Sequence, residues 1–212
     1  MTGCHDSQAE NYEAEVRSRL DDYIRENYFE ILDTVIGRAD LAAGLKVLDI
    51  GIGTGLLTER LPRGLELYGV DLSPRMLDKL REKKLPVDLA PGDFCHLPHP
   101  GEAFDRIIST FAFHHVGFSE KAAALAEMDR VLKPGGLMVI GDFMVENEAQ
   151  KESLRAKFRA ENRADMLQEL VEEYFTDLEE AYATLGALGY RTTYRRGATL
   201  SWILRAVKAP SR

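Results

Sequence analysis

Short apolar runs alternate with segments of helical periodicity through the middle of the chain. Runs rich in branched apolar residues predict buried strands at 46–50, 66–71, 86–90, 104–109 and 137–141. Alternating strands and helices are typical of right-handed crossovers and of a mostly parallel sheet with helices on both faces. The pattern therefore predicts an α/β, doubly wound fold.

Capping residues mark where the intervening helices begin and end. Ser73 followed by Pro74 predicts a helix start, because Ser is a good N-cap and proline has a helical φ. Ser119 predicts the start of a second helix, which 133–136 (Lys-Pro-Gly-Gly) ends before the next strand. A further helix is expected at 54–61, directly after the first strand.

The two ends of the chain depart from this alternation. Residues 13–36 predict one long helical stretch before the first strand, which we expect to act as a cover. Residues 145–188 exceed the length of one crossover helix and predict two helical pieces, with a capping box at 176–179 restarting the second. The segments 190–195 and 200–206 predict an antiparallel hairpin that closes the edge of a seven-stranded sheet.

The chain contains no internal repeat and no linker-like stretch, so we expect a single domain over 1–212. Its expected parts are an N-terminal helical cover at 1–44, a core at 45–142, a helical insertion or cap at 143–188 and the closing hairpin at 189–212.

Composition narrows the classes of function. The 212 residues include 27 Lys and Arg against 35 Asp and Glu, a formal charge of −8, which disfavours nucleic acid or an anionic membrane as a partner. Apolar runs are far shorter than the roughly 18 residues that a membrane span needs, and residues 1–10 lack the apolar segment of a signal peptide. We expect a cytoplasmic monomer or homodimer.

The two cysteines, Cys4 and Cys95, are too few for a disulfide scaffold. The segment 93–99 (Asp-Phe-Cys-His-Leu-Pro-His) contains possible metal ligands, but a loop broken by proline with no second Cys/His pair matches no recognised metal-site spacing. We therefore expect no metal site.

A glycine-rich turn follows the first predicted strand. Gly51, Gly53 and Gly55 stand at alternate positions, preceded by Asp49, and such a turn lets a ligand approach the backbone at a helix N-terminus. The alternative is a tight turn that only packs strand against helix. Asp71 ends the second strand about 20 residues beyond the first glycine, where a carboxylate can accept ribose hydroxyls. The third glycine comes one residue too early for a nicotinamide oxidoreductase.

These motifs, in this order, resemble those of class I S-adenosylmethionine (SAM)-dependent methyltransferases, and the resemblance implies their Rossmann-like fold. The resemblance covers about residues 45–142 and includes Asp49-x-Gly51-x-Gly53-x-Gly55, Asp71, Gly92-Asp93-Phe94, the strand 104–109 and Leu132-Lys133-Pro134-Gly135-Gly136. More narrowly, the chain is similar to the YrrT-like group of small bacterial methyltransferases at 109–115 (Ser-Thr-Phe-Ala-Phe-His-His), 173–176 (Glu-Tyr-Phe-Thr) and Ser201-Trp202.

The resemblance implies which residues bind the methionine end of SAM. Asp49 and the backbone of Gly51 and Gly53 would hold it, with Asp49 favouring its ammonium group, and Gly55 belongs to the same motif. Thr110, just beyond the fourth strand, would lie near the sulfonium.

The resemblance also assigns the nucleoside end. Asp71 would bind the ribose and Leu72 would pack on adenine, while Asp93 accepts from the adenine amine and Phe94 donates its backbone N–H to the ring. Tyr12 resembles a tyrosine that closes over the cofactor in related enzymes, and the alternative for it is ordinary helix packing.

Methyl transfer from a sulfonium is an in-line displacement, so the protein mainly aligns the reactants, an effect worth roughly 7–11 kcal/mol. A general base is needed only where the attacking atom carries a proton. His114 and His115 follow the fourth strand at the edge where open α/β sheets bind ligands. We expect these two as the catalytic candidates, able to take that proton or anchor the acceptor; the alternative is a structural role.

The sequence therefore predicts a SAM-dependent methyltransferase that acts on a small molecule. The alternative is a SAM-binding regulatory module without transfer activity, because binding and catalysis use the same loop.

Overall fold

A computed structural model describes residues 9–210 of the chain, so Cys4 and the first eight residues lie outside the described part. The strands are β1 (Lys46–Ile50), β2 (Glu66–Asp71), β3 (Val87–Pro91), β4 (Phe104–Thr110), β5 (Leu132–Val145), β6 (Thr176–Asp177), β7 (Tyr190–Arg196) and β8 (Ser201–Lys208). The helices are α2 (Tyr12–Ser18), α3 (Tyr28–Arg38), α4 (Pro74–Glu82), α5 (Lys121–Val131), α6 (Glu148–Ala160), α7 (Ala164–Glu172) and α8 (Leu178–Ala187). Three short 3₁₀ helices complete the elements, η1 (Thr58–Arg60), η2 (Phe113–His115) and η3 (Phe118–Glu120).

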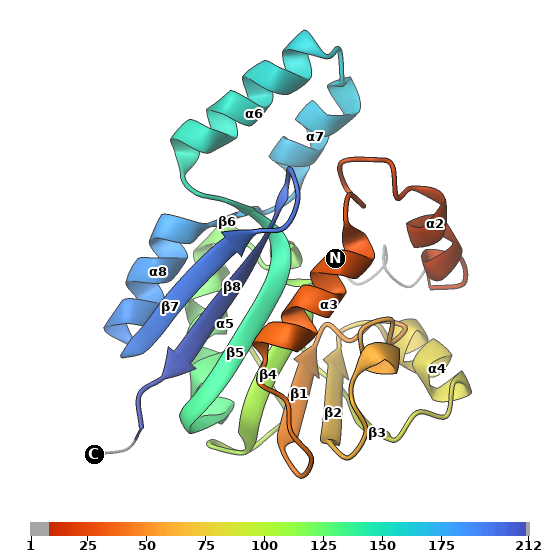
Figure 1. The fold of residues 1–212 in the computed structure, drawn as a ribbon, viewed down its shortest axis with the longest axis vertical. Coiled ribbons are helices and arrows are strands. Elements are labelled where there is room, and N and C mark those ends of the chain that lie inside the picture. The colour runs from red at the N-terminus through yellow and green to blue at the C-terminus, as the bar shows by residue number, and fades with distance from the viewer. Residues whose placement is uncertain (1–8, 211–212) are drawn as a thin grey trace.

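Seven strands follow one another across a single sheet in the order β3-β2-β1-β4-β5-β8-β7, and the two-residue β6 pairs only with β5 (Figure 1). The strands β1 to β5 are parallel, whereas β8 runs antiparallel between β5 and β7. The expected doubly wound parallel sheet with a C-terminal antiparallel hairpin is confirmed.

Alternate residues of each central strand enter different cores. Ile108 and Val139 pack with the α3 residues Ile31, Leu32 and Val35 on one face. Their neighbours Ile107 and Met138 pack on the other face, with buried side chains of α5 and α8. The sheet is therefore covered on both faces, as continuous apolar runs in parallel strands require.

The N-terminal region is not the single helix expected at 13–36. It contains the two helices α2 and α3, separated by turns at 19–27. Asn27 adopts a left-handed φ of 56°, which a continuing α-helix cannot accommodate. Leu20, expected in the packed stripe, lies in these turns and is exposed.

The prediction of a helix at 54–61 is also wrong, because only the short η1 forms in this segment. The residue after it, Leu61, is already extended and precedes Pro62, so the segment has no room for further helical turns. Ser119 lies inside η3 and does not cap α5, whose N-cap residue makes no side-chain hydrogen bond.

The region 145–188 holds three helices where two were expected. Asn162 has a positive φ of 54° between α6 and α7. The restart within 176–179 is confirmed, although Asp177 is the residue that caps α8 by accepting from the backbone N–H of Glu180 at 3.1 Å.

The N-terminal turns and the α6–α7 loop meet above the sheet (Figure 1). Tyr23 donates a hydrogen bond to Glu161 at 2.9 Å, and Arg163 pairs with Asp22 at 2.9 Å. The N-terminal cover and the helical cap expected from the sequence therefore contact each other, above the carboxyl ends of the parallel strands. Among residues 9–210, no helix is both long and apolar enough to cross a membrane.

We expect Gly141→Ala to destabilise the protein by about 1–3 kcal/mol, because overpacking forces neighbours to move. A Cβ at Gly141 in β5 would lie 2.7 Å from a methyl group of Val35 in α3. Gly186→Ala in α8, where a Cβ meets nothing within 4 Å, is the control and should leave stability unchanged or raise it by up to about 1 kcal/mol. Urea unfolding measures both, and equal midpoints for the two variants would contradict the close packing of α3 on β5.

Candidate functional site

The glycine turn after β1 forms the centre of the candidate site. Gly51, Gly53 and Gly55 all have a positive φ, between 56° and 85°. A Cβ at Gly51 would lie 2.2 Å from that of Ala112, and one at Gly55 would lie 2.4 Å from a methyl carbon of Leu80. A Cβ at Gly53 would meet nothing within 4 Å. Two of the glycines therefore allow close packing, and Gly53 borders the space that a ligand can approach.

Asp71 lies against this turn, as its position in the sequence predicted. One carboxylate oxygen accepts from the backbone N–H of Gly53 at 2.8 Å, and the other accepts from the backbone N–H of Ser73 at 2.8 Å. The next residue, Leu72, is half exposed at 49%. The end of β2 therefore holds the glycine turn and presents an apolar side chain beside it.

Asp49 is buried beneath the turn with few polar contacts. The hydroxyl of Thr58 donates to its carboxylate at a long 3.4 Å. Burial raises the pKa of Asp49 to about 7, and the nearby charge of Asp71 adds to the increase. A cationic group at this position would stabilise the ionised carboxylate.

The loop after β3 also reaches the glycine turn. Phe94 is buried, its ring contacts that of Phe113 edge to face at 5.1 Å between centroids, and one ring carbon lies 3.9 Å from where a Gly51 Cβ would be. Asp93 accepts from the backbone N–H groups of Cys95 and His96, at 2.7 and 2.9 Å, which shapes the loop.

Thr110 and Tyr12 lie on different elements, β4 and α2. Thr110 ends β4, half-buried and paired with Gly141 of β5. Tyr12 begins α2, and its hydroxyl lies 3.4 Å from that of Tyr28. An ion pair from Lys83 to Glu13, at 2.6 Å, fixes α2 beside α4. The expected cofactor residues thus lie along one edge of the sheet.

A second polar cluster is organised by Asp142, which lies within β5 near its C-terminal end. One of its carboxylate oxygens accepts from the successive backbone N–H groups of Ala112, Phe113 and His114, at 3.0, 2.6 and 3.2 Å. The other accepts from the Phe143 backbone N–H and from Nδ1 of His114, both at 2.6 Å. Burial by itself would raise the pKa of Asp142, but His114 and the backbone donors outweigh it and lower the pKa.

The imidazole groups of His114 and His115 lie together, and Glu173 faces them. The Nε2 atom of His114 lies 3.9 Å from a carboxylate oxygen of Glu173, and Nδ1 of His115 lies 3.5 Å from the same oxygen. His114 is buried, whereas His115 is partly exposed. The backbone N–H of Tyr174 donates to the His114 carbonyl at 3.2 Å, which ties the loop after α7 to η2.

Three polar residues of this cluster were not predicted from the sequence. Asp142 lies within β5, just beyond the predicted strand 137–141, and belongs to no motif. Lys121 begins α5, where its ammonium group donates to the Phe113 carbonyl at 3.0 Å. Burial lowers the pKa of Lys121 to about 8. Glu173 lies in a segment similar to the YrrT-like group, but its contact with His115 depends on the fold.

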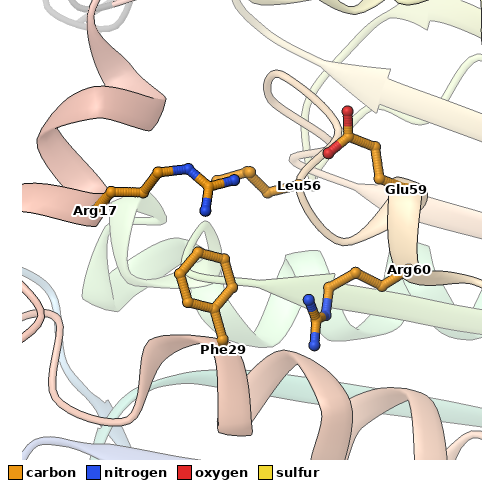
Figure 2. A pocket seen from close by; sticks show the side chains of 5 residues that line it. All are labelled: Arg17, Phe29, Leu56, Glu59 and Arg60. Carbon is orange, nitrogen blue, oxygen red and sulfur yellow. The ribbon is translucent and has the colours of Figure 1, made fainter.

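A separate cavity of about 190 Å³ lies between α2, α3 and the segment after the glycine turn. Figure 2 shows Arg17 and Arg60 reaching toward the ring of Phe29, with Leu56 and Glu59 on the far side. The guanidinium carbons lie 5.2 and 5.6 Å from the ring centroid. This cavity holds none of the expected cofactor residues and is smaller than a typical ligand pocket of about 300–1,000 Å³.

Comparison with known sequences indicates a methyltransferase. A family described as "Methyltransferase domain" matches residues 48–140. An uncharacterised methyltransferase of Geobacillus kaustophilus (strain HTA426) is 33% identical over 204 residues, which cover 94% of this chain and 93% of that protein. The uncharacterised methyltransferase YrrT of Bacillus subtilis (strain 168) is 30% identical over 184 residues, covering 85% and 84%.

Solved structures share the fold at lower sequence identity. Magnesium protoporphyrin IX methyltransferase (ChlM) from Synechocystis PCC 6803, with bound SAH, has a TM-score of 0.70 at 18% identity and covers 96% of this chain and 98% of its own. A possible histamine N-methyltransferase from Thermotoga maritima has a TM-score of 0.69 at 20% identity, covering 98% and 100%.

We expect Asp142→Ala to destabilise the protein by about 3 kcal/mol or more, because several buried donors lose their acceptor at once. Asp33→Asn is the matched control. It removes an ion pair with Arg60 in which both side chains are well exposed, and should cost less than about 1 kcal/mol. Urea unfolding of both variants tests this, and a loss for Asp142→Ala no larger than the control's would contradict its structural role.

Proposed function

This chain belongs to the bacterial methyltransferases that include YrrT, and we propose that it transfers the methyl group of SAM to a small-molecule acceptor by in-line displacement. The expectations of a Rossmann-like fold, a methyltransferase and SAM as its cofactor are confirmed. The observation that carries the proposal is the meeting of Asp49, the glycine turn and Asp71 at one edge of the sheet, beside His114 and His115.

The residues at the glycine turn fit the methionine end of SAM. Asp49 is buried with one weak donor, so the ammonium group of SAM would give its carboxylate the cation it lacks. The open space at Gly53 allows the ligand to approach the backbone, and Gly51 and Gly55 keep the turn packed beneath it. Thr110, at the end of β4, would lie near the sulfonium of SAM.

The nucleoside end fits the loops after β2 and β3. A carboxylate offers about four lone-pair sites, so Asp71 can hold Gly53 and Ser73 and still accept ribose hydroxyls. Leu72 is exposed beside it and available to pack on adenine. Asp93 and the backbone of Phe94 would bind the adenine edge, and Tyr12 would close the site from α2.

SAM supplies an electrophilic methyl group, and the protein's task is to align the acceptor with it and exclude water. The segments 1–44 and 143–188 are the proposed covers, since their turns meet above the carboxyl edge of the sheet. The formal charge of −8 favours a small molecule over nucleic acid as the acceptor. Within a single domain, we expect the acceptor to bind between the covers and the SAM site.

His114 and His115 are the proposed catalytic residues on the acceptor side. Asp142 accepts from Nδ1 of His114, so Nε2 is the atom left to act on the acceptor. His115 is the more exposed of the two and lies beside it, with 3.9 Å between the ring centroids.

Incubation of the protein with methyl-labelled SAM and a library of small molecules tests the proposal. We expect label to move to an acceptor and S-adenosylhomocysteine to be released. His115→Ala should lower turnover at least 10-fold while leaving SAM affinity within about twofold, because acid–base groups typically contribute 10²–10⁴-fold. Tyr182→Ala, an exposed position on α8, is the control. Tight SAM binding without transfer to any acceptor would favour a regulatory module instead.

The pKa of Asp49 predicts how SAM binding depends on pH. Burial raises this pKa to about 7, and only the ionised carboxylate attracts an ammonium group. SAM affinity should therefore fall roughly tenfold for each pH unit below 7, following the ionised fraction. Calorimetric titration between pH 5.5 and 7.5 measures this. Asp49→Asn should bind SAM more weakly at pH 7.5 and lose the pH dependence; an unchanged slope in that variant would exclude Asp49 as its source.

A further inference from the structure

We propose that His114, His115 and Glu173 bind a divalent transition-metal ion of the Zn²⁺ type. Among the described residues, these three form the only group of His, Cys, Asp and Glu side chains in which three ligand atoms converge, all within 4.8 Å of one another. The ligand set of two imidazole nitrogens and one carboxylate oxygen is one that catalytic zinc sites use, with a further position left open.

The spacing of the ligand atoms suits a metal ion. Bonds of about 2.0–2.2 Å in a tetrahedral site place neighbouring ligand atoms about 3.3–3.6 Å apart. The Glu173 oxygen lies 3.5 Å from Nδ1 of His115 and 3.9 Å from Nε2 of His114. Small rotations of His115 and Glu173, which are both partly exposed, would close the remaining distance.

The hydrogen bonding of His114 leaves a place for a cation. Asp142 already accepts from the backbone N–H groups of Ala112, Phe113, His114 and Phe143, so it is the acceptor in its 2.6 Å contact with Nδ1 of His114. Nε2 is then the ring nitrogen left for a further contact, and it faces a carboxylate oxygen of Glu173 at 3.9 Å. A cation between these two atoms would bind both of them.

The residues around His114 hold its ring as the neighbours of a metal-ligating histidine do. A carboxylate that accepts from the distal nitrogen of a ligating histidine fixes its tautomer and orientation, and Asp142 does this. Phe143 packs on the His114 ring at 4.7 Å between centroids, and the Tyr174 backbone holds the His114 carbonyl. His114 is therefore already oriented before any ion binds.

The chemistry of the donors selects the metal. Mg²⁺ and Ca²⁺ prefer sites made of oxygen ligands, whereas imidazole suits zinc and the neighbouring transition metals. The loop 93–99, which also contains Cys and His residues, does not compete, because the His96 side chain is 84% exposed and, among the described residues, this loop contributes to no group of three metal-ligating side chains.

The purpose of the metal rests on the proposed function, although its binding does not. A coordination position left open beside the proposed covers would hold a thiol or hydroxyl group of the methyl acceptor. His114 and His115 would then act on the acceptor through the ion.

Metal binding is measured on the full chain, free of any polyhistidine tag, by calorimetric titration with Zn²⁺ and by the visible absorption of added Co²⁺. We expect one ion per chain and a Co²⁺ spectrum of low coordination number. His115→Ala and Glu173→Gln should each weaken Zn²⁺ binding about 100-fold or more. This exceeds the 10–100-fold loss of affinity that is typical when a residue hydrogen-bonded to a metal ligand is replaced. Both changes are at partly exposed positions, and their unfolding midpoints confirm that the variants fold.

His96→Ala is the matched control, because His96 is also paired with a carboxylate, 3.2 Å from Asp93, but belongs to no group of three. Its Zn²⁺ affinity should equal that of the unmodified chain. Absence of Zn²⁺ and Co²⁺ binding, or binding that survives both ligand changes, would overturn the metal site. Neither result depends on methyl transfer, so the proposed function stands or fails separately.

Discussion

The loop after β4, which carries His114 and His115, depends on hydrogen bonds to the buried carboxylate of Asp142. The successive backbone N–H groups of Ala112, Phe113 and His114 donate to one of its oxygens, which is possible because Phe111 takes a left-handed φ of 50° and turns the chain back toward β5. Stacking of Phe111 on the buried Tyr28 ring, at 4.5 Å, holds that conformation. This turn sets the direction of the His114 side chain and the position of Ala112 against Gly51. It also sets where the loop before β6 packs.

The edge formed by the carboxyl ends of parallel strands explains why residues far apart in sequence meet. The glycine turn follows β1, Asp71 ends β2, and Phe94 lies in the loop after β3. Ala112, beyond β4, lies against Gly51, and His114 follows Ala112 by two residues. The proposed SAM site and the histidine cluster are therefore adjacent. The covers from α2 and the α6–α7 loop contact each other above this edge through Tyr23 and Glu161.

The central strands and the glycine turn could be predicted because local sequence determines them. Apolar runs define β1, β2 and β4, and the contact of Asp71 with Gly53 follows from the topology of parallel strands. The N-terminal break was missed, since Asn27 in a left-handed conformation leaves no apolar signature. The partnership of Glu173 with His114 and His115 could not be predicted, because it joins segments nearly 60 residues apart through a backbone contact at Tyr174. The roles of Gly51 and Gly55 in packing likewise depend on Ala112 and Leu80.

Two buried aspartates show how hydrogen bonding decides the character of each half of the site. Both side chains are excluded from solvent, and burial disfavours the charge of each. Asp142 is nevertheless held ionised, because backbone N–H groups and an imidazole donate to it. Asp49 has one long hydroxyl contact, and its pKa is raised to about 7. A carboxylate that accepts several hydrogen bonds serves as a rigid support, whereas one with a single long hydrogen bond gains most from a cationic ligand. The half of the site proposed to bind SAM is therefore the half in which the buried carboxylate has the weaker hydrogen bonding.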